Sequence, residues 1–280
     1  MLRVQYASKL FVDKVTCKFT DILVPSSPIL ALCGDIGNTS HTRTREFIQW
    51  ASRSWNKIIW IPGIEEWSSY NTMDTSINNM KYVASTVSNC SVLEKDSWDY
   101  IEDGRLSAVF LGATLWGTCL PGDGILHEQR NTKIHIQGNY GATCIMPNDI
   151  TMMNTESVKW IGNMLDELRQ EDYKRPVVML TYHRPSADFM CIADIEDKSI
   201  RKRLHNCLDQ VIQHPIQAWI AGDSYGSVSA MNRDGTIFFG TNTRGVDIRK
   251  TYINTFHTTI DISGDKQRWY PNTGMKHELQ

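Results

Sequence analysis

One short apolar run that stops at Gly-Asp constrains the fold of this chain most. Residues 29–38 read ILALCGDIGN, five apolar residues followed by a polar turn. A run of this length between turn residues is typical of a strand buried on both faces, as in α/β proteins. Asp35 then follows the carboxyl end of the strand, the edge at which open α/β sheets carry functional residues. Gly34 permits the sharp turn there. The alternative for Asp35 is a helix cap or turn residue.

The rest of the chain alternates apolar, strand-like runs with stretches of helical period. Residues 39–55 carry apolar side chains at helical spacing, with Ser40 or Thr42 as a candidate N-cap. This alternation predicts an α/β protein. The expected strands are 2–7, 29–33, 57–61, 91–93, 98–102, 106–111, 176–180, 216–221, 228–231, 236–240 and 256–262, and the expected helices are 39–55, 73–87, 155–168 and 199–213.

Charge and cysteine content argue against several classes of function. The 29 Lys and Arg and the 31 Asp and Glu form no long block of one sign, so nothing indicates a nucleic-acid partner or a membrane surface. The seven cysteines are scattered without a C-x-x-C pair, which favours reduced thiols over disulfides or a zinc site. The sequence shows no signal-peptide core and no apolar run long enough to span a membrane, and Gln280 follows the KHEL near the end. We expect a soluble, intracellular protein of the cytoplasm.

Two segments depart from the alternating pattern. Residues 1–263 are expected to form a single domain, because no linker interrupts them. Within it, residues 117–148 contain five glycines and two prolines without a clear period, which indicates a lid or an interaction loop. Residues 264–280 are expected to be a polar C-terminal tail, in which Trp269 and Tyr270 are candidates for partner contact; the alternative is a frayed terminus.

Five short stretches at the predicted strand ends carry a family resemblance. They read YASKLFVD, LALCGDIGN, IPGIEEW, TYHRP and GDSYG. In this order they resemble the Asp-x-His, Gly-Asp, Gly-Asn-His-Glu, Thr-His-x-x-Pro and Gly-His-x-His motifs of the calcineurin-like metallophosphoesterases. FLGATLW and TNTRGV also resemble a short bacterial and viral branch of that family. The resemblance extends over residues 1–250 and implies a four-layer α/β-β/α sandwich of two mixed sheets flanked by helices.

The same resemblance indicates that most metal ligands are absent. In the family, two divalent metals activate the water that attacks phosphorus. Among the positions of this chain that match the family's ligands, Asp35 alone keeps the ligand residue. His183 aligns beside a ligand position, and its simplest interpretation is a hydrogen-bonded loop histidine. The vestigial active-site positions are Lys9, Phe11, Asp35, Ile64, Glu65, Tyr182, His183, Asp223 and Tyr225.

Lys9 changes the charge of the site as well as its ligands. An ammonium ~4 Å from a dication would be repelled by about 8 kcal/mol at an effective dielectric of ~20. Phe11 and Ile64 offer no donor atom and exclude the water that an open coordination position requires. We therefore hypothesise that Lys9 faces Asp35, and also Glu65 and Asp223, as a fixed cation in place of the metals. No metal and no cofactor is expected.

These arguments favour a catalytically inactive, metallophosphoesterase-like protein that binds another protein or assembles with itself. Because degenerate members of this branch occur in large DNA viruses, the resemblance also suggests a virion-associated or assembly role. One alternative is a residual phosphoesterase that holds one Mg²⁺ or Mn²⁺ on Asp35, Glu65 and Asp223. Another is a phosphate or nucleotide binder without turnover, with Arg184 and Arg244 as anion contacts, although solvated loop residues are the simpler interpretation of both arginines.

Overall fold

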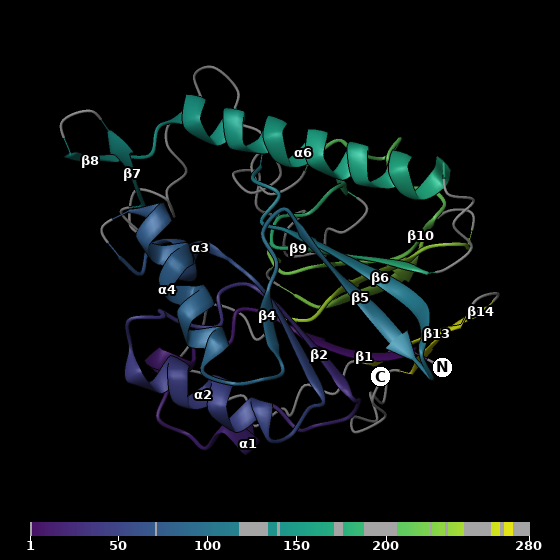
Figure 1. The fold of residues 1–280 in the computed structure, drawn as a ribbon, viewed down its shortest axis with the longest axis horizontal. Helices are drawn as coiled ribbons and strands as arrows, with labels where there is room; N and C mark the ends of the chain where they lie inside the picture. The colour runs from purple at the N-terminus through teal and green to yellow at the C-terminus, as the bar shows by residue number, and fades with distance from the viewer. Residues whose placement is uncertain are drawn as a thin grey trace, which may run out of the picture.

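Two six-stranded sheets packed face to face form the centre of the molecule (Figure 1). The computed structural model describes residues 2–70, 72–117, 134–138, 141–170, 176–187, 206–224, 226–232, 235–243, 259–263 and 266–270. None of the helices within these ranges is long and apolar enough to cross a lipid bilayer.

The first sheet is a parallel core with an antiparallel extension at one side. β1, β2, β3 and β4 run parallel, and β13 pairs antiparallel with β1. The register places Val4 beside Ile29 and Leu30 beside Ile58, so the apolar runs of the sequence lie next to one another. In spatial order the strands are β14 (Lys266–Tyr270), β13 (Thr259–Ser263), β1 (Leu2–Ala7), β2 (Ile29–Cys33), β3 (Lys57–Ile61) and β4 (Cys90–Val92).

The second sheet has four parallel strands between two antiparallel edge strands. β12, β10, β9 and β6 run parallel, while β11 and β5 pair antiparallel at the two edges. In spatial order they are β11 (Val228–Met231), β12 (Phe238–Thr241), β10 (Ile216–Ala221), β9 (Val177–Thr181), β6 (Arg105–Ala113) and β5 (Asp96–Glu102). Both sheets are therefore mixed, as the family resemblance implies.

Helices cover the outer face of each sheet (Figure 1). Side chains alternate between the faces of a strand, so each central strand contributes to two apolar layers. On β2, for example, Leu30 and Leu32 pack with Phe47 of α2 on the outside, while Ala31 and Cys33 face the second sheet. The helical segments are η1 (Val12–Lys14), α1 (Phe19–Ile22), α2 (Thr42–Ser52), α3 (Ile64–Trp67), α4 (Met73–Ser85) and α6 (Pro147–Gln170).

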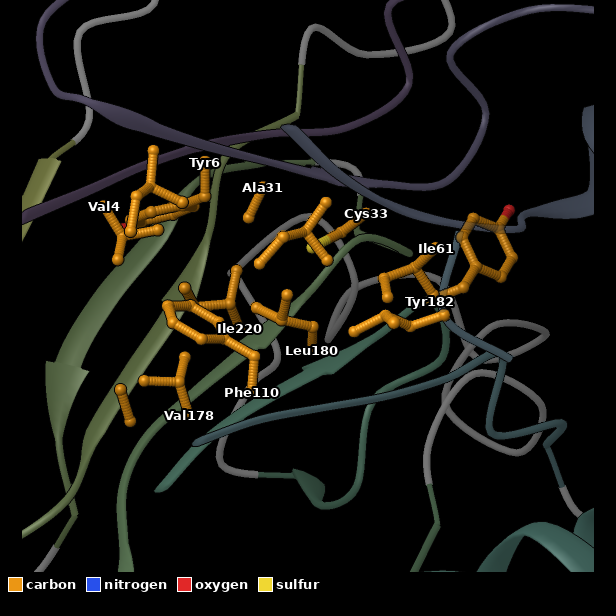
Figure 2. Close-up of a cluster of buried hydrophobic side chains, with 14 of the residues drawn as sticks. Val4, Tyr6, Ala31, Cys33, Ile61, Phe110, Val178, Leu180, Tyr182 and Ile220 are labelled. Atoms are coloured by element: carbon orange, nitrogen blue, oxygen red, sulfur yellow. The ribbon is translucent and has the colours of Figure 1, made fainter. Parts of the chain in front are cut away.

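The inner layer joins the two sheets. Figure 2 shows Tyr6 and Ile61 of the first sheet directed toward Leu180 and Ile220 of the second. On the far side, Trp219 and its neighbours pack under α6. The order of layers is helices, sheet, sheet and helix, which confirms the predicted four-layer sandwich.

Several expected segment boundaries differ from the structure. The sequence predicts a helix only from residue 155, whereas α6 begins at Pro147. Proline suits the first position of a helix. In addition, the Met146 amide donates a hydrogen bond to Asp149 Oδ2 at 2.8 Å. The excursion 117–148 contains the hairpin of β7 (His135–Gly138) and β8 (Gly141–Cys144). The predicted boundary at residue 263 falls inside a hairpin, since β14 pairs with β13.

The expected helix 199–213 lies partly outside the described residues. Its described part, from residue 206, forms turns. The amides of Asn206 and Leu208 bond to the carbonyls of Arg184 and Pro185 at 2.8 and 2.9 Å. These backbone groups are therefore committed to the loop after β9, which explains why the helical period of the sequence is not realised there.

Candidate functional site

The predicted site residues meet where the carboxyl ends of the parallel strands of both sheets converge. Lys9 follows β1, Asp35 follows β2, and Ile64 follows β3 in the first sheet. Tyr182 and His183 follow β9, and Asp223 follows β10, in the second sheet. Because the two sheets pack face to face, these strand ends form one buried cluster of polar groups.

Two glycines permit the close approach of the strand ends. A Cβ atom at Gly222 would lie 1.6 Å from the carbonyl oxygen of Cys33, across the gap between the sheets. A Cβ atom at Gly34 would lie 2.3 Å from the Tyr182 ring, and Gly34 has a φ of +82° that side chains rarely adopt. The Gly-Asp pairs of the sequence therefore bring the two sheets into contact as well as presenting their carboxylates.

Lys9 and Asp223 form a buried ion pair. Lys9 Nζ lies 2.7 Å from Asp223 Oδ1, and the two residues are 2% and 0% exposed. The other carboxylate oxygen lies 3.0 Å from Nδ1 of His183. Burial opposes ionisation of Asp223, but the Lys9 ammonium and the His183 ring together hold the pKa of this carboxyl below its usual range. Both oxygens of Asp223 thus have a nitrogen partner.

Two hydrogen bonds hold the Asp35 carboxylate, one from the second sheet and one from the start of α3. The hydroxyl of Tyr182 donates to Asp35 Oδ2 at 2.6 Å, and the amide of Glu65 donates to Oδ1 at 2.9 Å. Burial raises the pKa of the Asp35 carboxyl, and the nearby charge of Lys9 counteracts that effect. Tyr182 and the amide of Glu65 therefore occupy both oxygens of the Asp35 carboxylate.

Left-handed backbone conformations position this cluster. Lys9, Phe11 and Asp35 have φ angles of 50°, 47° and 55°, values that cost a non-glycine residue about 1–2 kcal/mol each. The amide of Lys9 bonds to the Gly34 carbonyl at 3.0 Å, and the amide of Phe11 bonds to the Asp35 carbonyl at 3.1 Å. The loops after β1 and β2 therefore support each other in these conformations, which turn Lys9 and Asp35 toward the second sheet.

The Glu66 carboxylate links the ends of β2 and β3 through hydrogen bonds. Its carboxylate accepts from the amides of Gly63, Asp35 and Ile36 at 2.8, 2.9 and 2.8 Å. Burial, followed by the charge of Asp35, raises the pKa of Glu66 to about 8, although the three amides favour the ionised form. Since backbone amides occupy its oxygens, Glu66 acts as a structural brace.

Glu65 takes a different place from the one hypothesised. Its carboxylate pairs with Lys14, at a partly exposed position, while its backbone amide supports Asp35. The Lys14 ammonium also lies 4.8 Å from the centre of the Phe11 ring. Phe11 and Ile64 are buried and apolar, as their residue types require.

His183 and Arg184 are both buried beside Asp223. The His183 ring packs edge-on against Tyr182, with centroids 4.7 Å apart. Its Nε2 atom is buried without a hydrogen-bond partner among the described residues. The charge of Arg184 helps to lower the pKa of Asp223, so this predicted anion contact lies near a carboxylate. The other predicted positions Tyr225 and Arg244 lie outside the described residues.

The residues at the strand ends do not fit a pair of divalent metals. Lys9 places a positive charge on Asp223, and Tyr182 and a backbone amide occupy Asp35. Phe11 and Ile64 supply no donor atoms. Within the part of the chain that the structure describes, no three His, Cys, Asp or Glu side chains are grouped as metal ligands.

Comparison with known proteins supports the fold. No protein-family model matches the chain. The phosphopantetheinyl hydrolase PptH of Mycobacterium tuberculosis superposes with a TM-score of 0.58 over 97% of this chain and 96% of its own, at 15% identity. The chain has the calcineurin-like phosphoesterase fold. The uncharacterized protein L509 of Acanthamoeba polyphaga mimivirus is 26% identical over 250 residues, which is 83% of each chain. At these identities the structural likeness concerns the fold alone.

The sequence did not reveal two of the contacts that define the site. The motifs identified Tyr182 and His183 as replacements or neighbours of ligands, without showing that they bond to Asp35 and Asp223. The pairing of Lys14 with Glu65 was also missed. An available signal was the chemistry of Tyr182 and Lys9, because both side chains can donate a hydrogen bond to a carboxylate.

Proposed function

We propose that this protein is a catalytically inactive member of the phosphoesterase fold that works by binding another protein. The observation that carries the proposal is the buried ion pair between Lys9 and Asp223, at 2.7 Å. The Lys9 ammonium supplies the positive charge that the buried Asp223 carboxylate requires, so a side chain of the protein itself balances this charge.

Electrostatics support the loss of the metal centre. A dication ~4 Å from the Lys9 ammonium would meet a repulsion of about 8 kcal/mol at an effective dielectric of ~20. A metal would also have to displace the Tyr182 hydroxyl from Asp35. Without a metal, the described residues at the strand ends would lack the Lewis acid that activates water in two-metal phosphoesterases.

The residual-enzyme alternative receives less support from the same geometry. It requires Asp35, Glu65 and Asp223 to hold one Mg²⁺ or Mn²⁺. Each of these three carboxylates already has a donor partner: Tyr182, Lys14 and Lys9, respectively. An ion would therefore replace three existing interactions, two of them with ammonium groups.

A binding role is favoured by the exposed apolar side chains. Large apolar and sulfur-containing residues are common at protein interfaces. Exposed examples occur on α4, β5, α6 and β11, and one directly precedes α6. They are Tyr82, Ile101, Met146, Met152 and Met231. The relative in a mimivirus supports an assembly or virion-associated role inside a host cell as the setting for such binding.

Calorimetric titration with Mn²⁺ tests the proposal. In the wild-type protein, no stoichiometric Mn²⁺ uptake is expected at the strand ends. Lys9→Asp should increase Mn²⁺ affinity at least tenfold, because it removes the fixed cation and adds a hard oxygen donor. Lys14→Asp is the matched control, since Lys14 pairs with Glu65 at a partly exposed position.

Two results would overturn the proposal. One is stoichiometric Mn²⁺ binding by the wild-type protein that disappears in Asp35→Asn. The other is a folded Lys9→Asp variant whose Mn²⁺ affinity equals that of the wild type. A protein partner whose binding is unaffected by EDTA and by Asp35→Asn would support the binding role.

A further inference from the structure

The small β7–β8 hairpin presents a cysteine and a histidine side by side. His135 is the first residue of β7 and Cys144 the last of β8, and the antiparallel register places them opposite each other. Cys144 Sγ lies 3.3 Å from His135 Nε2. Figure 1 shows this hairpin beside the start of α6, apart from the two large sheets. Thiolate and imidazole are the donor groups that zinc prefers.

The backbone beneath this pair is anchored in the core. The amide of Ile145 bonds to the carbonyl of Ile134 at 2.9 Å and continues the ladder by one step. Both isoleucines are buried in the large apolar cluster that includes the layer between the sheets, and β7 also packs against α4. Cys144 itself is exposed. The two donor atoms are therefore presented to solvent from a base that packing holds in place.

The separation of the two donor atoms suits one metal ion. Zinc binds sulfur at ~2.3 Å and nitrogen at ~2.0–2.1 Å, so a tetrahedral angle places the two ligand atoms about 3.5 Å apart. The observed 3.3 Å requires only a small adjustment of the two side chains. We propose that Cys144 and His135 are half of a tetrahedral zinc site, completed by the same two residues of a second copy of this chain.

A second copy supplies what one hairpin lacks. Structural zinc sites take four protein ligands, and Cys₂His₂ is a common set. Two hairpins related by a two-fold axis would provide two cysteines and two histidines, the arrangement expected of a symmetric dimer. Within the described residues, β7 and β8 form a sheet of their own that pairs with no further strand.

The proposed site departs from one expectation from the sequence. The scattered cysteines argued against zinc, because no C-x-x-C pair occurs. The hairpin instead joins residues that are nine positions apart, and its antiparallel register brings them together. The pair lies on a different element from the strand-end cluster, so the proposal does not depend on whether that cluster is inactive.

Cobalt substitution tests the site directly. Co²⁺ added to the full-length protein under reducing conditions should give the absorption bands of thiolate-bound tetrahedral cobalt, at about one ion per two chains, and Zn²⁺ should abolish them. Zn²⁺ should also convert the protein to a dimer in sedimentation velocity. Cys144→Ser and His135→Gln should each lower the affinity at least tenfold and prevent the dimer. Cys207→Ser, a change at another exposed cysteine, is the matched control.

Three results would overturn the proposal. They are the absence of tetrahedral cobalt bands, bands that persist unchanged in Cys144→Ser, and binding of one ion per chain without dimerisation. Because Cys144→Ser leaves the strand ends intact, Mn²⁺ titration of this variant reports on the strand-end cluster alone. Failure of one proposal is therefore distinguishable from failure of the other.

Discussion

Lys9 Nζ and Asp223 Oδ1 lie 2.7 Å apart and join the end of β1 in one sheet to the end of β10 in the other. The pair is buried, and neither charge has bulk water to stabilise it. A buried charge is stable only while its partner is present. The ion pair therefore joins the two sheets at the edge where the carboxyl ends of their parallel strands meet.

Removal of the Lys9 ammonium should destabilise the protein strongly. Lys9→Ala leaves Asp223 buried without its cation, a change that costs about 3–5 kcal/mol for a broken buried pair. Lys14→Ala removes the partly exposed pair with Glu65 and should cost at most about 1 kcal/mol. Urea unfolding of both variants measures the difference. Equal losses of unfolding free energy would show that the buried pair contributes no more to stability than the partly exposed pair.

Loss of the Tyr182 hydroxyl should leave Asp35 with one fewer donor. Tyr182→Phe is expected to lower the free energy of unfolding by about 1–3 kcal/mol, because a buried carboxylate oxygen loses its hydrogen bond. Tyr82→Phe is the control: Tyr82 is 62% exposed, and its change should remain within about 0.5 kcal/mol. Thermal and urea unfolding would both detect this difference, and two equal variants would contradict the assigned contact.

Glycine at position 222 is expected to be essential for closure of the sheets. Gly222→Ala would place a methyl group 1.6 Å from the Cys33 carbonyl oxygen and force the ends of β2 and β10 apart. We expect a loss of more than about 3 kcal/mol. Gly162→Ala in α6 meets no atom within 4 Å and should stabilise the helix by about 0.5–1 kcal/mol. Circular dichroism melts of the two alanine variants should therefore move in opposite directions.

Ionisation of Glu66 should make the protein less stable as the pH rises from about 4.5 to about 8. The folded-state pKa of about 8 lies above the ordinary value of 4.5, so the folded protein holds a proton that the unfolded chain releases. Stability from this group is then present at low pH and is lost as the pH rises through that interval. Glu66→Gln should reduce the pH dependence of the melting temperature between pH 5 and 8. An unchanged slope would exclude Glu66 as its source.

The fold was largely predictable because the apolar runs of the sheets are short and bounded by turn residues. The expected strands at residues 2–7, 29–33 and 57–61 agree with β1, β2 and β3. The start of α6 was missed because residues 147–154 adjoin a glycine-rich stretch that obscures the helical period. The turns after Asn206 arise from bonds to the loop at Arg184, a distant contact that local periodicity does not contain.

The site was predictable in its residues but not in its contacts. Lys9 was identified because a cation stands where the family has a carboxylate, and the structure gives it Asp223 as a partner. The bond of Tyr182 to Asp35 depends on how the two sheets pack, which places side chains 147 residues apart in contact. The distance in space between two such side chains is set by the packing of the whole inner apolar layer.

Phosphodiester hydrolysis with added Mn²⁺ tests the central claim most directly. The measurement compares wild type, Asp35→Asn and Lys9→Asp on a generic phosphodiester, each in the Cys144→Ser background to remove the hairpin site. The account predicts that wild type and Asp35→Asn show the same background rate with and without Mn²⁺. Turnover by the wild type that depends on Mn²⁺ and disappears in Asp35→Asn would contradict it.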